Sequence, residues 1–121
     1  MTSRKSHKRR GAKFEIEVKD YFRSRGYSAE RLARAGRNDE GDVVVHEDFL
    51  GQIGIIEAKA PGESGRIDLS GWTKEARTEA GNYAKARALQ QAEILPAVII
   101  KARGKAVEDS YVVFRLGDLF E

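Results

Sequence analysis

Apolar residues recur at helical spacing in two segments of the chain. Over residues 13–25 they fall at positions i, i+4, i+7 and i+8, which forms one stripe of a helix, and Gly26 follows where a helix commonly ends. The alanine-rich residues 71–92 contain a similar stripe that begins at Trp72, and Ser70 can cap their first turn. We therefore expect two helices, with Trp72 anchoring the second one to a sheet rather than stacking on DNA.

Shorter segments between and after these helices have the character of β-strands. They are rich in β-branched residues and are bounded by turn residues, and the expected strands cover residues 27–33, 42–47, 52–60, 97–102 and 110–116. A connection through Gly51 predicts that the second and third strands form a hairpin. The resulting order, αβββαββ, favours an α/β fold with a mixed central β-sheet flanked by helices. Residues 61–71, with three glycines, are expected to form a long surface loop of functional importance.

Length and composition exclude several classes of protein. A chain of 121 residues fits a single domain, and its longest apolar run, Ile94–Ile100, is far shorter than the roughly 20 residues of a membrane-spanning helix. No apolar stretch follows the basic amino terminus, so we expect a cytoplasmic protein without membrane contact. The chain has no cysteine and two histidines, His7 and His46. A metal ion would therefore be held by oxygen ligands, and His46 is expected to be structural or exposed.

The charge is distributed unevenly. Residues 1–13 contain six basic residues and no acidic one, although the whole chain has a net charge of +3. We expect residues 1–12 to form a flexible basic arm that contacts nucleic acid, and residues 13–121 to form the folded domain. A solubilising tail or a targeting signal would have the same composition. The expected DNA contacts are Arg4, Lys5, Lys8, Arg9, Arg10 and Lys13, together with Arg34 and Arg37, for which solvated loop positions are the alternative.

Candidate chemistry lies at the end of the third expected strand, in Glu57-Ala58-Lys59. Side chains alternate along a strand, so Glu57 and Lys59 should emerge on the same face. The hairpin should bring Asp42, at the start of the preceding strand, beside Glu57. Two carboxylates without cysteine or histidine suit Mg²⁺, and a neighbouring ammonium group suits phosphodiester hydrolysis. The alternative is a solvated surface ion pair, which contributes at most about 1 kcal/mol.

Four motifs together resemble those of a known family. They are Arg10-Gly11-Ala12-Lys13-Phe14-Glu15, Arg25-Gly26-Tyr27, Gly41-Asp42-Val43-Val44 and Ile55-Ile56-Glu57-Ala58-Lys59. This pattern resembles the archaeal-type Holliday junction resolvases and their phage relatives, within the PD-(D/E)xK nuclease superfamily. The resemblance implies a restriction-endonuclease-like core and a metal-dependent DNA endonuclease.

The resemblance also assigns roles to individual residues. It implies that Asp42, Glu57 and the backbone carbonyl of Ala58 bind Mg²⁺, for which Mn²⁺ could substitute, and that Lys59 is the catalytic lysine. Glu15 would complete the site directly or through water, with Glu17 as the alternative on the same helix. The superfamily has proline before the first metal-binding aspartate, whereas this chain has Gly41. Asp39 or Glu40 therefore remains open as a substitute for Asp42.

The expected function is the resolution of four-way junctions by a homodimer. A junction has pseudo-two-fold symmetry, which a dimer with two copies of the site would match. The basic arms would hold the phosphate backbones without reading sequence. One alternative is another endonuclease of the same superfamily that acts on flaps, nicks or linear duplex. Another is a nucleic-acid-binding protein without catalysis. A prokaryotic or phage-infected cell is the expected setting.

Overall fold

The computed structural model of the protein describes residues 4–32, 39–62 and 65–120. The helices and strands follow one another in the order expected from the sequence, and three short 3-10 helices lie before β4, between β4 and β5, and after β5. The elements are α1 (Arg4–Ser24), β1 (Ala29–Arg31), β2 (Val43–Phe49), β3 (Gln52–Lys59), α2 (Leu69–Ala86), η1 (Gln91–Glu93), β4 (Ile94–Ile100), η2 (Val107–Asp109), β5 (Tyr111–Val113) and η3 (Leu116–Leu119). The predicted order αβββαββ is confirmed.

The strands form one mixed sheet in the order β1-β2-β3-β4-β5. β3 and β4 are parallel, and the other neighbouring pairs are antiparallel. The parallel pair requires a crossover, which α2 supplies, whereas β2 and β3 are joined by the predicted hairpin at Gly51. The sheet therefore brings the carboxyl ends of β3 and β4 to the same edge.

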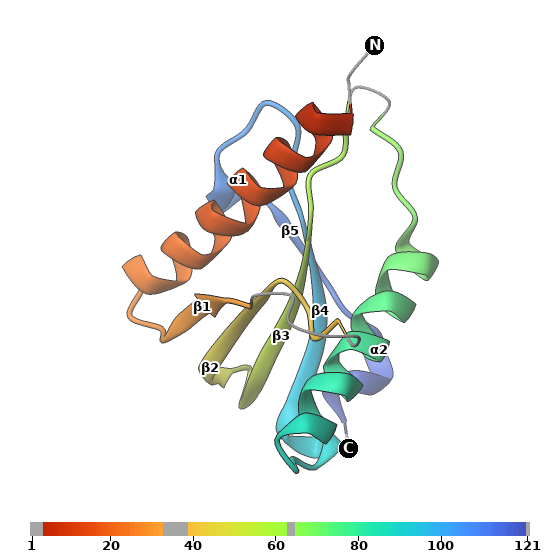
Figure 1. The fold of residues 1–121 in the computed structure, drawn as a ribbon. Coiled ribbons are helices and arrows are strands. Elements are labelled where there is room, and N and C mark those ends of the chain that lie inside the picture. The colour runs from red at the N-terminus through yellow and green to blue at the C-terminus, as the bar shows by residue number, and fades with distance from the viewer. Residues whose placement is uncertain (1–3, 33–38, 63–64, 121) are drawn as a thin grey trace.

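The two helices cover opposite faces of this sheet (Figure 1). α1 packs through Phe14 and Val18 on a face that includes Val43 and Ile56. α2 packs on the other face, where the neighbouring strand residues Val44 and Ile55 meet its buried alanines and Tyr83. Because successive side chains on a strand point to opposite faces, each residue of β2 and β3 is assigned to one helix or the other.

Helix α1 extends further than the sequence predicted. It begins at Arg4 rather than Lys13, so the residues assigned to a flexible basic arm have helical backbone from Arg4 onward. The predicted end is confirmed, since Gly26 has a φ of +93° and the amide of Tyr27 donates to the carbonyl of Phe22 at 3.0 Å. This left-handed residue closes the helix in the manner typical of a C′ glycine.

Helix α2 differs from the expectation at its first turn. The N-cap is Asp68 and not Ser70, because the Asp68 carboxylate accepts a hydrogen bond from the amide of Gly71 at 2.9 Å. Trp72 packs against the buried cluster of Ala76, Val98 and Ile100, which confirms the prediction that it anchors the helix to the sheet. Within the described residues, neither helix combines the length and apolar character needed to cross a membrane.

Strand β4 begins three residues earlier than predicted and includes Pro96. Proline lacks the amide proton that a strand partner would need. Here Pro96 pairs with Ile55 of β3, and the pairing of β4 with β5 starts only at Val98. The second side of the strand is therefore unpaired at Pro96, which explains why proline is tolerated.

Candidate metal centre

The end of β3 presents a carboxylate and an ammonium group to the α2 face of the sheet. Glu57 is 4% exposed, and its Oε1 atom lies 3.7 Å from Nζ of Lys59. The side chain of Ala58 points the other way and joins the core under α1. The alternation predicted for Glu57, Ala58 and Lys59 is therefore observed.

Asp42 lies beside this strand end. The pairing of Val43 with Ile56 brings the preceding residue, Asp42, next to Glu57, as the hairpin predicted. Asp42 is 9% exposed, its amide donates to the carbonyl of Ile56, and its Oδ2 atom accepts a hydrogen bond from the amide of Ala58 at 2.9 Å. The carboxylate is thus held against the backbone that links Glu57 to Lys59.

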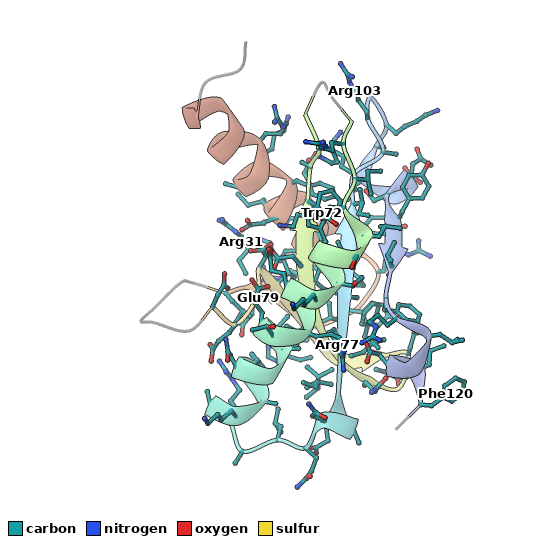
Figure 2. The ribbon with its side chains drawn as sticks, turned by 90° about the vertical axis from the view of Figure 1, so that its right-hand side faces the viewer. Arg31, Trp72, Arg77, Glu79, Arg103 and Phe120 are labelled. Carbon is teal, nitrogen blue, oxygen red and sulfur yellow. The ribbon has the colours of Figure 1, made fainter. Side chains whose placement is uncertain are left out.

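Helix α2 contributes two acidic residues that the sequence analysis did not identify. Ligand oxygens of Glu57, Glu75 and Glu79 all lie within 4.8 Å of one another. Glu79 is 5% exposed and belongs to the buried side of α2, with Ala76, Ala80 and Tyr83. Figure 2 shows Glu79 and Trp72 on this helix. An acidic residue inside the apolar stripe of a helix was the signal that could have revealed Glu79, and Glu75 precedes it by one helical turn.

Lys59 connects the strand to the helix. Its Nζ atom donates a hydrogen bond to Oε1 of Glu75 at 2.9 Å and lies 5.7 Å from the centre of the Trp72 ring. The ammonium group is therefore held by two carboxylates and an aromatic face. This position keeps the charged end of Lys59 at the acidic group instead of in bulk solvent.

The donor set fits a hard divalent cation. Three carboxylates repel one another at these distances, and the single positive charge of Lys59 contacts two of them, Glu57 and Glu75. The Oε2 atom of Glu57 is buried and has no hydrogen-bond partner among the described residues. A buried carboxylate oxygen without a donor is costly, and oxygen ligands are those that Mg²⁺ and Mn²⁺ prefer. The group of Glu57, Glu75 and Glu79 could thus hold a metal ion.

The two acidic residues before Asp42 make other contacts. Oδ1 of Asp39 accepts from the amide of Gly41 at 2.9 Å, and Oε2 of Glu40 lies 3.0 Å from Nη1 of Arg87. Asn82 donates to the carbonyl of Asp39 at 2.8 Å, so α2 and its C-cap residue Arg87 both contact this turn. These contacts give Asp39 and Glu40 a part in shaping the chain before Asp42.

Gly41 occupies a position at which proline is excluded. Its φ is +104°, whereas a proline ring fixes φ near −65°. A Cβ atom at this position would also lie 3.0 Å from Cγ2 of Ile55. Glycine therefore allows the chain to turn tightly over β3 and place Asp42 at the strand end.

Glu15 lies outside the acidic group. It is on α1, and its Oε1 atom pairs with Nη2 of Arg31 at 3.0 Å, while Nε of Arg31 lies 3.3 Å away. The structure thus brings Asp42, Glu57 and Lys59 together. Among the described residues, the group within 4.8 Å consists of Glu57, Glu75 and Glu79, and it includes neither Glu15 nor Asp42. Binding through water, and the choice between Glu15 and Glu17, stay predictions.

The predicted DNA-contacting residues are described only in part. The side chain of Arg10 donates from Nε to the carbonyl of Ala60 at 3.3 Å, just beyond β3, and Lys13 is exposed. His46 is exposed, as expected, and its Nε2 atom lies 3.0 Å from Oε1 of Glu30. The other predicted contacts lie outside the described side chains, and these are Arg4, Lys5, Lys8, Arg9, Arg34 and Arg37.

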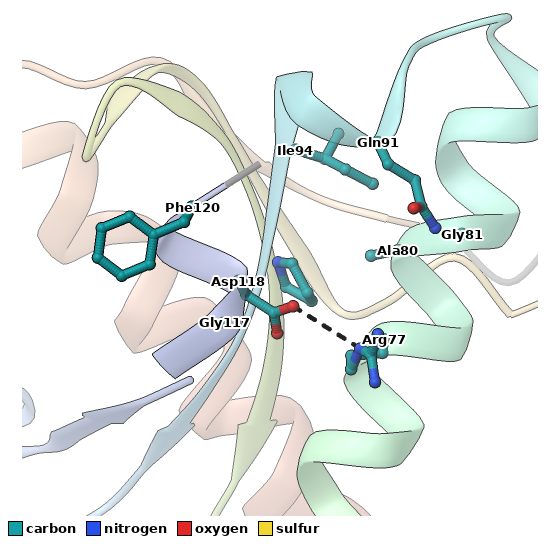
Figure 3. Close-up of a pocket in the computed structure, with 9 residues that line it drawn as sticks. Arg77, Ala80, Gly81, Gln91, Ile94, Gly117, Asp118 and Phe120 are labelled. Carbon is teal, nitrogen blue, oxygen red and sulfur yellow. Dashed lines mark ion pairs between the residues drawn. The ribbon is translucent and has the colours of Figure 1, made fainter. Parts of the chain in front are cut away.

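A separate cavity of about 220 Å³ lies near the start of β4. Arg77 and Asp118 face each other across it, with Nε 3.7 Å from Oδ1 (Figure 3). Its lining residues include none of the three clustered glutamates. On β4 the cavity is lined by Ile94 and Pro96, which pair with Ile53 and Ile55, whereas Glu57 pairs with Val98 further along the two strands. We therefore assign the candidate chemistry to the acidic group and not to this cavity.

Comparison with known proteins gives a structural match and no sequence match. No model of a protein family matches the chain, and no curated protein sequence matches it. The structure is similar to that of Hjc, a Holliday junction resolvase from the archaeal hyperthermophile Archaeoglobus fulgidus, with a TM-score of 0.53 and 16% sequence identity. The match covers 85% of this chain and 87% of that chain. This likeness shows the fold, so the predicted restriction-endonuclease-like core is confirmed.

Proposed function

We propose that this protein is a metal-dependent DNA endonuclease of the PD-(D/E)xK superfamily that resolves four-way junctions. The observation that carries the proposal is the buried acidic group around Glu57, which lies at a strand end beside Asp42 and Lys59. Similarity of the fold to a Holliday junction resolvase supports the same assignment. Residues 13–121 form the nuclease domain, and the basic residues before them contact DNA.

Glu57 is the central metal-binding residue of this proposal. It belongs both to the ligand set expected from the sequence, with Asp42 and the Ala58 carbonyl, and to the group with Glu75 and Glu79. The buried Oε2 atom of Glu57 favours it as a ligand. When bound, Mg²⁺ or Mn²⁺ supplies Lewis-acid polarisation of a phosphoryl oxygen and stabilises charge on the leaving oxygen. Glu15 is proposed to reach the cation directly or through water.

Lys59 is proposed as the catalytic lysine. Its contacts with Glu57 and Glu75 keep the ammonium group beside the carboxylates, and Trp72 limits the directions in which the side chain can turn. From this position Nζ can donate hydrogen bonds to a phosphate oxygen or to the attacking water. Asp42, through its bond to the Ala58 amide, fixes the strand end that carries both Glu57 and Lys59.

The proposed assembly is a homodimer on junction DNA. Two copies of a small active site related by a two-fold axis can cut two opposed strands, which matches the pseudo-symmetry of a four-way junction. Six basic residues in residues 1–13 would contact phosphates, which gives affinity without sequence specificity. Arg34 and Arg37 are proposed as further phosphate contacts.

A cleavage assay with matched substrates tests this function. A labelled four-way junction, a flap and a linear duplex of the same sequence are incubated with the protein and Mg²⁺. The proposal predicts paired, symmetric incisions in the junction and weaker cutting of the other substrates. Preferred cutting of flap or duplex would instead assign the protein to another endonuclease activity of the superfamily. Binding without cleavage in either Mg²⁺ or Mn²⁺ would refute the nuclease proposal.

A further inference from the structure

Three segments distant in sequence meet beyond the carboxyl end of β3. They are the start of α1, the residues that follow β3, and the turn between β4 and β5, all at one end of the molecule (Figure 1). Two hydrogen bonds join them: Nε of Arg10 donates to the carbonyl of Ala60, and the amide of Lys101 donates to the carbonyl of Lys59 at 2.9 Å. Both hydrogen bonds therefore tie these segments to the end of β3, the strand that carries Glu57 and Lys59.

A groove of about 220 Å³ opens at this end between described residues of the loop after β3 and the turn after β4. Pro61, Gly62, Gly65 and Ile67 line it from the loop, and Ile100, Lys101, Ala102, Arg103 and Lys105 line it from the turn. Tyr111, at the start of β5, also lines the groove and is 60% exposed. The groove is thus lined by loop residues on one side, by the turn after β4 on the other side, which we call the basic wall, and by the exposed ring of Tyr111.

The basic wall contains three cations within five residues, Lys101, Arg103 and Lys105. No acidic residue is among the described residues that line the groove. Nζ of Lys101 donates to the carbonyl of Lys105 at 3.1 Å, which holds the turn closed. Figure 2 shows Arg103 at the end of the molecule beyond Trp72. Such a concentration of positive charge beside an acidic catalytic group is suited to a polyanion that passes both.

We propose that this groove binds the phosphodiester backbone of the DNA strand that extends from the cleavage site. Lys101 and Lys105 contact phosphate oxygens, and Tyr111 packs against a sugar or a base. The proposal rests on the proposed function for the position of the cut, since the strand must lie next to Lys59. The proposed groove is a DNA-binding surface in addition to the basic residues of α1. Its lysines lie near the other end of the sequence.

The test is a comparison of DNA affinity in two double variants. Lys101→Gln/Lys105→Gln removes two charges of the groove, and Lys74→Gln/Lys85→Gln removes two exposed charges of α2 as the matched control. Binding of a labelled four-way junction is measured without divalent metal, so that no cleavage interferes, over a range of salt concentrations. The single variant Lys105→Glu, at an exposed position, provides a second measurement if Lys101 proves necessary for folding.

The expected result follows from counterion release. The slope of log K against log salt is negative, and each lost phosphate contact reduces its magnitude by about 0.9 and weakens binding roughly eightfold at about 0.1 M salt. The groove variant should therefore lose nearly two units of slope and bind roughly 60-fold more weakly, while the control stays within about twofold of the wild type. Equal losses in both double variants, or unchanged affinity in the groove variant, would overturn the proposal.

This binding measurement, together with the cleavage assay on the same junction, separates the groove from the nuclease activity. A groove variant with reduced affinity in a protein that never cleaves DNA would support the groove and refute the proposed function. Normal cleavage by the wild type with unchanged affinity in the groove variant would refute the groove alone. Absence of DNA binding by the wild type would overturn both.

Discussion

Replacing Glu57 by glutamine should stabilise the protein when no divalent metal is present. Glu57 lies within 4.8 Å of two other carboxylates, whereas Nζ of Lys59 is 3.7 Å from its Oε1 atom. At an effective dielectric constant of about 20, each repulsion is roughly 3.5 kcal/mol at 4.8 Å and the attraction roughly 4.5 kcal/mol at 3.7 Å. Glu57→Gln removes both repulsions and one attraction, and Lys59 keeps its contact with Glu75. The free energy of unfolding should therefore rise by about 2–3 kcal/mol.

Thermal unfolding measures this effect and its reversal by metal. A gain of about 2–3 kcal/mol corresponds to a rise in Tm of about 10 °C for a domain of this size. Adding Mg²⁺ at one hundred times its Kd should raise the free energy of unfolding of the wild type by about 2.7 kcal/mol, and its Tm accordingly. The Tm of Glu57→Gln should stay nearly unchanged. The two proteins should then converge as the Mg²⁺ concentration increases.

A second Glu→Gln substitution serves as the control. Glu30 is exposed and pairs with His46 at 3.0 Å, so Glu30→Gln should change stability by less than about 1 kcal/mol and leave the response to Mg²⁺ intact. The reasoning is refuted if Glu57→Gln melts below the wild type without metal and both proteins respond equally to Mg²⁺. That result would describe a structural ion pair between Glu57 and Lys59 rather than a metal-binding carboxylate.

Two further predictions concern the chain around the site. Gly41→Ala should lower the free energy of unfolding, measured in urea, by about 1–3 kcal/mol more than Gly26→Ala does. Both residues have a positive φ, but only at position 41 would the new Cβ atom lie 3.0 Å from Ile55. Equal losses in the two variants would refute the role of this contact. Burial raises the pKa of Tyr83 above 10.0, against a smaller lowering by Arg87, so the unfolded chain releases this proton first. The free energy of unfolding should consequently fall as the pH rises above about 10. Measured between about pH 8 and 11, this fall should be smaller in Tyr83→Phe than in the wild type. An identical pH dependence in both proteins would contradict this.

Local patterns were sufficient to predict most of the fold. The helical stripe that contains Phe14 and Val18, the hairpin at Gly51 and the strand alternation at Glu57 depend on neighbouring residues, and the structure confirms each. The start of β4 was not predictable in this way, because Pro96 is tolerated only where β5 does not pair with it. The start of α1 was also missed, since a basic segment can be helical without an apolar stripe.

The candidate site was predicted in the part that the hairpin determines. Asp42 and Glu57 are close because the register of two consecutive strands places them together. Glu75 and Glu79 come from a helix that reaches the site through a crossover. The apolar stripe of this helix shows which side faces the sheet, but no local pattern shows which strand residues that side will meet. The N-cap shows the same limit on a smaller scale, because Asp68 and Ser70 are both suitable capping residues and the path of the loop determines which one is used.

The most direct test of the central claim is single-turnover cleavage of a labelled four-way junction by the wild type, Glu57→Gln and Lys59→Gln, each with and without Mg²⁺. We predict paired incisions by the wild type in Mg²⁺ alone, and a loss of cleavage in both variants while their affinity for the junction is retained. Cleavage that persists in Glu57→Gln, or that does not require a divalent metal, would contradict a metal-dependent active site at the end of β3.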